Sequence, residues 1–372
     1  MKITIAMDSF KGSVSSLQAG SAVQNGIRRV FSGADINVFP LADGGEGTAY
    51  ALIHGMHGEE QHITVTGTLG ESVNSMYGIV SQTETAIIEI SEAAGITLVP
   101  KDKRNPLVTT TYGIGEMITD AISKGCRNFI IGLGGSATND GGIGMLQALG
   151  YEVIDKHGNQ VRRGAQGLKD IVDILDSHVV PELSECRFQI ACDVSNPLCG
   201  TDGCSAVFSP QKGATEEMID NMDKWLYSYA TIASKRYPNA DMTQKGAGAA
   251  GGLGFAFLTF MNAVLCSGVD IVLRETHLEE YIKDSDIIIT GEGKLDSQTI
   301  MGKAPIGVAK LAKKYNKPVI AFAGCVEEGA HYSNDVGIDA YFPIIRKMSS
   351  IESLMDTDNT ISNLADTAEQ VF

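Results

Sequence analysis

Two acidic, glycine-rich segments, each following a short apolar strand, constrain the fold of this chain more than any other feature. The first is Met7–Ser13, after the strand Lys2–Met7, and the second is Thr290–Asp296, after the strand Asp286–Ile289. The isoleucine run before the second segment is typical of a strand that is buried on both faces of a parallel sheet. Because turns at the carboxyl ends of parallel strands are where α/β sheets bind ligands, we expect the two segments to face each other.

The two ends of the chain share a strand–helix pattern that the middle lacks. Residues 1–60 predict strand, helix and strand, with Ser13 as the helix N-cap, and residues 276–372 predict three more strands with helices between them. Residues 62–90 instead alternate apolar and polar side chains, which predicts an antiparallel meander.

These patterns predict two α/β domains. One is a flavodoxin-like, doubly wound parallel sheet formed by residues 1–60 plus 276–372, and the other is a mixed α/β domain of residues 61–275 inserted within it. In the flavodoxin-like order the strand before Thr290 lies beside the first strand, so Lys11 and Asp296 would share one crevice. We expect the active site in the cleft between the two domains.

Composition excludes several classes of protein. The chain has 372 residues and a net charge of −16 without a cluster of Lys and Arg, which argues against a nucleic-acid-binding face. Its seven cysteines include no CxxC pair, as expected for reduced thiols in the cytoplasm. The uncharged segment 246–269 is long enough to cross a bilayer, but its glycines favour a buried helix, so we expect no membrane span.

The segment Gly132–Gly142 follows the strand Asn128–Ile131 and precedes a helix. Its five glycines, with Ser136 and Thr138, favour a loop that cradles phosphate, although a tight turn with a capping hydroxyl is the alternative. The same loop also matches a dinucleotide-binding pattern, with Asp155 as the ribose acid. The sequence has no Walker A motif, since Lys303 in Gly302-Lys303 is followed by alanine.

Three further loops carry candidate groups. Asp43 and Glu46 lie in an acidic glycine loop after the second strand, and Asp193 follows the strand Arg187–Ala191. Carboxylates at strand ends can bind a metal or accept a proton, although turn formation is the alternative for each. Lys212 precedes a predicted helix and could neutralise a phosphate or form a solvated cap.

Taken together, the loops resemble the bacterial glycerate kinase family (type-1 glycerate kinases). The resemblance covers residues 2 to about 345 and rests on six segments in order: Asp8–Ser13, Ala42–Thr48, Gly134–Gly142, Cys192–Leu198, Pro210–Ala214 and Gly291–Thr299. It departs from the family pattern at Lys294, where arginine is usual, and at Lys245, where proline often precedes the glycine run. A lysine at position 294 keeps the charge but loses the bidentate geometry of a carboxylate clamp.

The resemblance implies an enzyme that uses ATP and Mg²⁺ to phosphorylate glycerate to a phosphoglycerate, with 2-phosphoglycerate favoured. Phosphoryl transfer depends on positioning and charge neutralisation, and the loops suggest a role for each group. The expected substrate-binding residues are Asp8, Ser9, Lys11, Ser13 and Lys294. The expected ATP-binding residues are Gly134, Gly135, Ser136, Thr138, Asn139 and Lys212. The expected catalytic residues are Lys11, Asp193 and Asp296, and the expected metal ligands are Asp43, Glu46 and Asp193.

Two other functions remain open at this stage. An NAD(P)-dependent hydroxy-acid dehydrogenase would account for the dinucleotide-like pattern that ends at Asp155. A nucleotide-binding protein without catalytic activity would account for the loops but not for so many polar groups at strand ends.

Overall fold

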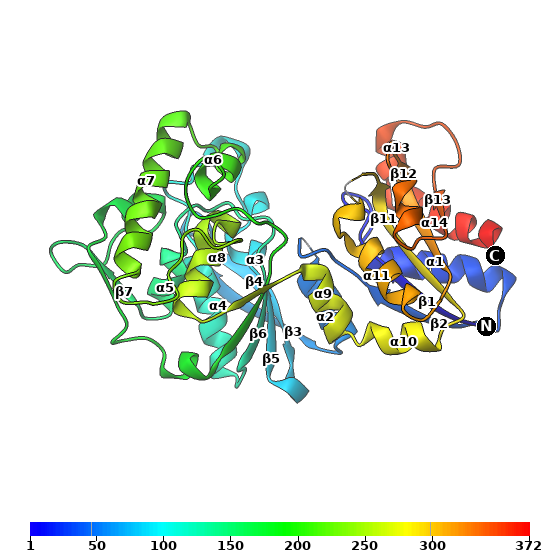
Figure 1. The fold of residues 1–372 in the computed structure, drawn as a ribbon, viewed down its shortest axis with the longest axis horizontal. Coiled ribbons are helices and arrows are strands. Elements are labelled where there is room, and N and C mark those ends of the chain that lie inside the picture. The colour runs from blue at the N-terminus through cyan, green and yellow to red at the C-terminus, as the bar shows by residue number, and fades with distance from the viewer. Residues whose placement is uncertain (46, 298) are drawn as a thin grey trace. The chain divides into compact units, whose positions relative to one another are not determined.

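The computed structural model describes residues 1–45, 47–297 and 299–372, which form two compact units. Unit 1 comprises residues 1–43, 50–57 and 268–372, so it contains both ends of the chain, and unit 2 comprises residues 44–49 and 58–267 (Figure 1). Each unit contains a sheet with parallel strands and covering helices, so the predicted class of two α/β domains is confirmed.

Unit 1 is built on a five-stranded parallel sheet in the order β13-β12-β11-β1-β2. This is the expected flavodoxin-like order, with β1 beside β11. The elements are β1 (Lys2–Met7), α1 (Ser16–Val30), β2 (Asp35–Pro40), α9 (Gly268–Glu275), α10 (Leu278–Asp284), β11 (Ile287–Leu295), α11 (Ala304–Lys313), β12 (Val319–Val326), α12 (Tyr332–Asp335), β13 (Ala340–Pro343), α13 (Ile351–Met355) and α14 (Thr357–Val371). Helix α2 (Thr48–Gly55) begins in unit 2 and continues in unit 1.

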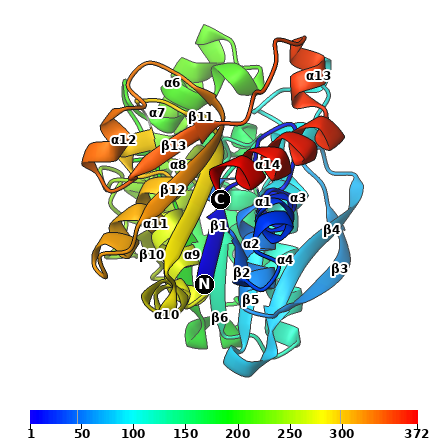
Figure 2. The same cartoon turned by 90° about the vertical axis from the view of Figure 1, so that its right-hand side faces the viewer.

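Helices cover both faces of this sheet. Helices α1 and α14 pack against each other on one face, and α9, α10 and α11 form the layer on the other (Figure 2). The approach of α1 to α14 is close because Gly26 lies where a Cβ would overlap the carbonyl oxygen of Ala365. The N-cap of α1 is Ser15 rather than Ser13, because Ser15 and Gln18 form a capping box.

Strand β11 is longer than the sequence predicts. Gly291 to Leu295, expected as a loop, continue the strand and pair with β12, with Lys294 opposite Cys325. The glycines allow this, since a Cβ at Gly291 would overlap the carbonyl oxygen of Phe322. Because successive side chains of a strand point to opposite faces, Glu292 and Lys294 lie on the same side of the sheet.

Unit 2 contains a six-stranded sheet in the order β10-β9-β6-β5-β4-β3. Strands β3, β4 and β5 pair antiparallel, as the alternation predicts, whereas β5, β6, β9 and β10 pair in parallel. The elements are β3 (Glu59–Thr66), β4 (Ser72–Val80), β5 (Thr85–Glu89), α3 (Ser91–Ala94), α4 (Tyr112–Ser123), β6 (Asn128–Gly132), α5 (Ile143–Ala148), β7 (Glu152–Ile154), β8 (Asp173–Leu175), β9 (Arg187–Ala191), α6 (Cys204–Phe208), α7 (Glu216–Ala233), α8 (Ala249–Phe260) and β10 (Val264–Cys266).

The uncharged segment from Gly246 onward forms α8, which is buried in the core of unit 2. Residues Ala250, Gly251 and Gly252 have positive φ, so the glycine-rich entry is a break rather than a regular turn of helix. Among the described residues, none of the helices combines the length and hydrophobicity that a bilayer crossing requires.

Candidate active site

A cavity in unit 1 lies at the carboxyl ends of β1 and β11, where the strand order of the sheet reverses. Its volume is about 430 Å³. Several of the predicted substrate-binding residues line it, together with acids and lysines from β11 and the chain after it. The charged and hydroxyl lining groups are Asp8, Ser9, Lys11, Ser13, Asp43, Glu292, Lys294, Lys303 and Thr360.

Asp8 is the most buried of the predicted substrate-binding residues, with 4% of its surface exposed. It follows β1 directly, and its backbone N–H donates to the carbonyl of Gly291 at 2.9 Å, which extends the pairing of β1 with β11. Its carboxylate accepts the N–H of Ser9 at 2.6 Å. Burial, followed by the negative charge of Asp43, raises the pKa of Asp8 to about 7. The Asp8 carboxyl can therefore exchange a proton near neutral pH.

Glu292 is the second buried acid of this cavity. Its carboxylate accepts a hydrogen bond from Thr299 Oγ1 at 2.7 Å and lies 3.6 Å from the ammonium of Lys303. Burial raises the pKa of Glu292. Neither Glu292 nor Lys303 was predicted as a site residue. The sequence offered a signal for both, since Glu292 lies between two glycines and Lys303 follows Gly302.

Lys294 and Asp296 form an ion pair at the edge of this region. The Lys294 ammonium lies 2.8 Å from Asp296 and 3.1 Å from Glu327. Hydrogen bonds to these two carboxylates raise the pKa of Lys294. Asp296 also accepts the N–H of Thr299 at 3.3 Å. Lys294 also lines the cavity, so its predicted role as a substrate clamp and that of Asp296 as a proton acceptor stay predictions.

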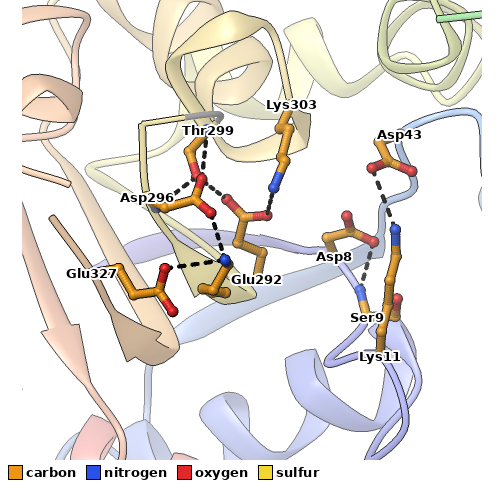
Figure 3. Close-up of polar contacts among 10 residues, drawn as sticks. Asp8, Ser9, Lys11, Asp43, Glu292, Asp296, Thr299, Lys303 and Glu327 are labelled. Carbon is orange, nitrogen blue, oxygen red and sulfur yellow. Dashed lines mark hydrogen bonds and ion pairs between the residues drawn. The ribbon is translucent and has the colours of Figure 1, made fainter. Parts of the chain in front are cut away.

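Lys11 lies on the other side of Asp8 and Glu292 from Asp296 (Figure 3). Its ammonium is 3.5 Å from the carboxylate of Asp43, and 64% of its side chain is exposed. Such an exposed ammonium can turn toward an anionic ligand at small cost, because a surface ion pair contributes little stability. Lys11 lines the cavity together with Glu292 and Lys294 of the second acidic segment, whereas Asp296 is not among the lining residues, so the crevice predicted for Lys11 and Asp296 stays a prediction.

Ser9 and Ser13 line the same cavity. The Ser13 hydroxyl shares a hydrogen bond of 2.6 Å with Thr360 Oγ1, so α14 helps to position the loop. Gly12 has a φ of 81°, which fits the sharp turn between the two serines.

The predicted phosphate loop lies in unit 2, between β6 and α5. Within the described residues, the backbone N–H groups of Gly134, Gly135 and Ser136 have no hydrogen-bond acceptor, and Gly135 has a φ of 70°. Three successive N–H groups without acceptors are the type of backbone feature that binds an anion. Thr138 Oγ1 and Asn139 Oδ1 are buried and likewise lack a hydrogen-bond partner within the described part of the chain.

Lys212 lies beneath this loop and is only 2% exposed. Its ammonium donates to Ser136 Oγ at 2.8 Å and to the carbonyl of Thr138 at 2.6 Å. Burial lowers the pKa of Lys212 to about 8. Lys212 therefore fixes the conformation of the loop rather than forming a solvated helix cap.

Asp140 is a buried acid of the same loop, and it was not predicted as a site residue. Its carboxylate accepts both the N–H and the hydroxyl of Thr111, at 3.0 and 2.9 Å, and the N–H of Gly142 at 3.1 Å. These bonds tie the loop to the start of α4. Burial nevertheless raises the pKa of Asp140.

The structure describes two of the three predicted metal ligands, and these two belong to different units. Asp43 belongs to unit 1, Asp193 is exposed on the loop after β9 in unit 2, and Glu46 lies outside the described residues. Among the residues that the structure describes, no group of three or more His, Cys, Asp or Glu side chains could hold a metal ion.

The dinucleotide-binding alternative required Asp155 to act as a ribose acid. Asp155 instead accepts the backbone N–H groups of His157 at 2.8 Å and Asn159 at 3.0 Å, and these bonds lower its pKa. The Asp155 carboxylate therefore stabilises the turn that follows β7.

A protein-family model described as the Glycerate kinase family matches residues 3–372. The chain belongs to the glycerate kinase family. A Haemophilus influenzae protein named glycerate kinase is 47% identical over 371 residues, which cover 100% of this chain and 98% of that protein. An Escherichia coli K12 protein named glycerate 2-kinase is 47% identical over 352 residues, which cover 95% of this chain and 92% of that protein.

A solved structure agrees with these matches. The crystal structure of a Salmonella typhimurium LT2 protein, a candidate glycerate kinase 2, has a TM-score of 0.91 and is 44% identical, covering 100% of this chain and 97% of that one. The family resemblance inferred from the loops and the assignment of the chain as a glycerate kinase are confirmed. As a member of a kinase family, the protein has ATP as its expected second substrate.

Proposed function

We propose that this protein transfers the γ-phosphate of ATP to the 2-hydroxyl of glycerate and forms 2-phosphoglycerate. The observation that carries the proposal is the buried Asp8 carboxyl, which lines the cavity beside the exposed ammonium of Lys11 and whose pKa of about 7 lies in the range of a general base. The name of the Escherichia coli relative, glycerate 2-kinase, supports the choice of hydroxyl.

Asp8 is the proton acceptor in this proposal, in place of Asp296. A base must accept the proton of the substrate hydroxyl as the phosphate is transferred, and its pKa should lie near the pH at which the enzyme works. Asp296 is held by Lys294 at 2.8 Å, whereas the Asp8 carboxylate accepts the backbone N–H of Ser9 and lines the cavity. The ammonium of Lys11 and the hydroxyls of Ser9 and Ser13 bind the carboxylate of glycerate.

The phosphates of ATP bind to the N–H groups of Gly134, Gly135 and Ser136 in unit 2. Their lack of acceptors, the unpartnered hydroxyl of Thr138 and the positive charge of Lys212 beneath the loop support this assignment. Lys212 holds the loop in place by donating to Ser136 and Thr138, and its positive charge attracts the phosphates.

Mg²⁺ would bind Asp43 together with phosphate oxygens. The residues fit this ion, because Mg²⁺ usually takes one or two carboxylates and completes its shell with waters and phosphate. The negative charge of Asp43 raises the pKa of Asp8, a repulsion that a cation beside Asp43 would relieve. Bound Mg²⁺ would neutralise charge on the transferred phosphate. Glu46 and Asp193 remain predicted ligands.

We further propose that the protein acts in the cytoplasm, since all seven of its cysteines are unpaired.

The test is an assay of ADP release with glycerate and a panel of other small hydroxy acids, with and without Mg²⁺. We expect glycerate to give the highest kcat/KM, and phosphorus NMR of the product to show 2-phosphoglycerate. Formation of the 3-phosphate would correct the choice of hydroxyl. ADP release that does not depend on glycerate, or reduction of NAD(P) in a parallel reaction, would reject the proposal.

A further inference from the structure

The cavity of unit 1 has an apolar wall that glycerate does not explain. The segment after β13 and the short helix α13 contribute Ile344, Ile345, Ile351, Leu354 and Met355 to its lining. Glycerate carries an oxygen on each of its three carbons, so it offers no apolar surface to this wall. A volume of about 430 Å³ lies in the range of pockets that enclose drug-sized ligands, and a three-carbon acid fills only a fraction of it.

Three of these apolar side chains, Ile345, Ile351 and Met355, are exposed at a cost in free energy, whereas Ile344 is buried. Ile351 is 75% exposed and Met355 is 42% exposed. Exposed apolar groups gathered around a cavity, with polar groups inside it, mark a ligand-binding site more often than scattered surface residues do. Methionine is suited to such a wall because its unbranched side chain adapts to a flat ligand.

Asn363 adds a polar group to this wall. It projects from α14 into the lining of the cavity and is half-buried. Among the described residues, none forms a hydrogen bond with the Asn363 carboxamide. A carboxamide offers a donor and an acceptor side by side, and it pairs with the amino group and the adjacent ring nitrogen of adenine.

We propose that the apolar part of this cavity binds the adenine base of ATP, with the Asn363 carboxamide facing the edge of the base. The inference rests on the proposed kinase activity and concerns the base alone. Ile351 and Met355 pack against the ring faces. Asn363 distinguishes adenine from guanine when it faces the edge with N7, because adenine presents a donor (the 6-amino group) and an acceptor (N7) there, whereas guanine presents two acceptors (O6 and N7). The position at the strand-order reversal of unit 1 agrees with the place where doubly wound sheets bind nucleotides.

Steady-state kinetics of Asn363→Ala test this proposal. We expect KM for ATP to rise about tenfold, KM for glycerate to stay within about twofold, and the preference for ATP over GTP to fall about tenfold. Met355→Ala should raise KM for ATP without changing the ATP/GTP preference. Ser362→Ala, an exposed neighbour on α14, is the matched control and should change none of these constants. A rise in KM for glycerate alone would assign the whole cavity to glycerate and overturn the proposal.

Photolabelling of the unaltered protein with 8-azido-ATP gives a result that does not depend on how a variant folds. Peptides containing residues 344–363 should carry the label, and excess ADP should remove it. Label confined to peptides of unit 2 would overturn the proposal. Kinase activity on glycerate, measured in the same sample, separates the adenine-site hypothesis from the proposed function. Activity without label at residues 344–363 would reject the adenine site and leave the proposed function intact.

Discussion

Replacing Lys212 with methionine removes a positive charge from the interior of unit 2 while keeping a side chain of similar length. The ammonium is 2% exposed and is held by Ser136 Oγ and the carbonyl of Thr138. Its burial lowers the pKa to about 8 from an unperturbed value of 10.5. The charged form is therefore destabilised in the folded protein, and this cost should appear in how stability depends on pH.

The sign follows from proton binding. Between pH 8 and pH 10.5 the unfolded chain keeps the Lys212 proton that the folded protein has released, so the free energy of unfolding rises with pH. With these two pKa values, the contribution of Lys212 grows by about 2 kcal/mol between about pH 7.5 and pH 9.5. Lys212→Met lacks this contribution, so its stability relative to the unaltered protein should fall by that amount as the pH rises.

Urea unfolding followed by tryptophan fluorescence measures this difference. The chain has one tryptophan, Trp225, which lies on α7 and packs against the core of unit 2, so its signal reports on the unit that contains Lys212. Lys235→Met removes an exposed lysine from the same unit and is the matched control. Its stability curve should stay parallel to that of the unaltered protein. Parallel curves for Lys212→Met as well would refute the argument that the Lys212 ammonium pays a desolvation cost.

Three further substitutions test the site and the packing of unit 1. Asp8→Asn removes the proposed base, and we expect kcat to fall about 100-fold or more in the glycerate assay while the melting temperature holds or rises; an unchanged kcat would exclude Asp8 as the base. Lys11→Met should raise KM for glycerate at least about tenfold, since a charged hydrogen bond to the carboxylate is lost, and normal kinetics would remove Lys11 from the site. Gly26→Ala places a Cβ against the carbonyl oxygen of Ala365 and should destabilise the protein by about 1–3 kcal/mol in thermal unfolding, whereas Gly33→Ala, with nothing within 4 Å, should be neutral.

The order of the unit 1 sheet could be predicted because it depends on patterns that the sequence states directly. The isoleucine run before Thr290 marks a buried parallel strand, and the acids and glycines after Met7 mark its neighbour. The alternation in residues 62–90 likewise gave the antiparallel part of unit 2. Periodicity over short distances identified these strands, and the order of the unit 1 sheet followed from the flavodoxin-like topology that alternating strands and helices predict.

Other features depended on contacts that the sequence does not state. Glycines after Thr290 predict a loop, yet they serve close strand packing and allow β11 to continue to Leu295. Asp296 resembles a free acid in the sequence, but its ion-pair partner Lys294 lies two residues earlier, near the end of β11. The contact between Glu292 and Lys303 could not be predicted, because the two residues meet only after the chain turns back.

The pairing of β1 with β11 has a consequence for synthesis of the protein. Ile3 of β1 pairs with Ile287 of β11. During synthesis on the ribosome, the apolar strand β1 is therefore exposed long before β11 has been made. At elongation rates of about 5–20 residues per second, that wait lasts on the order of tens of seconds. Residues 58–267 are contiguous and can finish their own core during this interval. Strand β1 can pair with β2 early, but its edge that faces β11 stays unpaired throughout this interval.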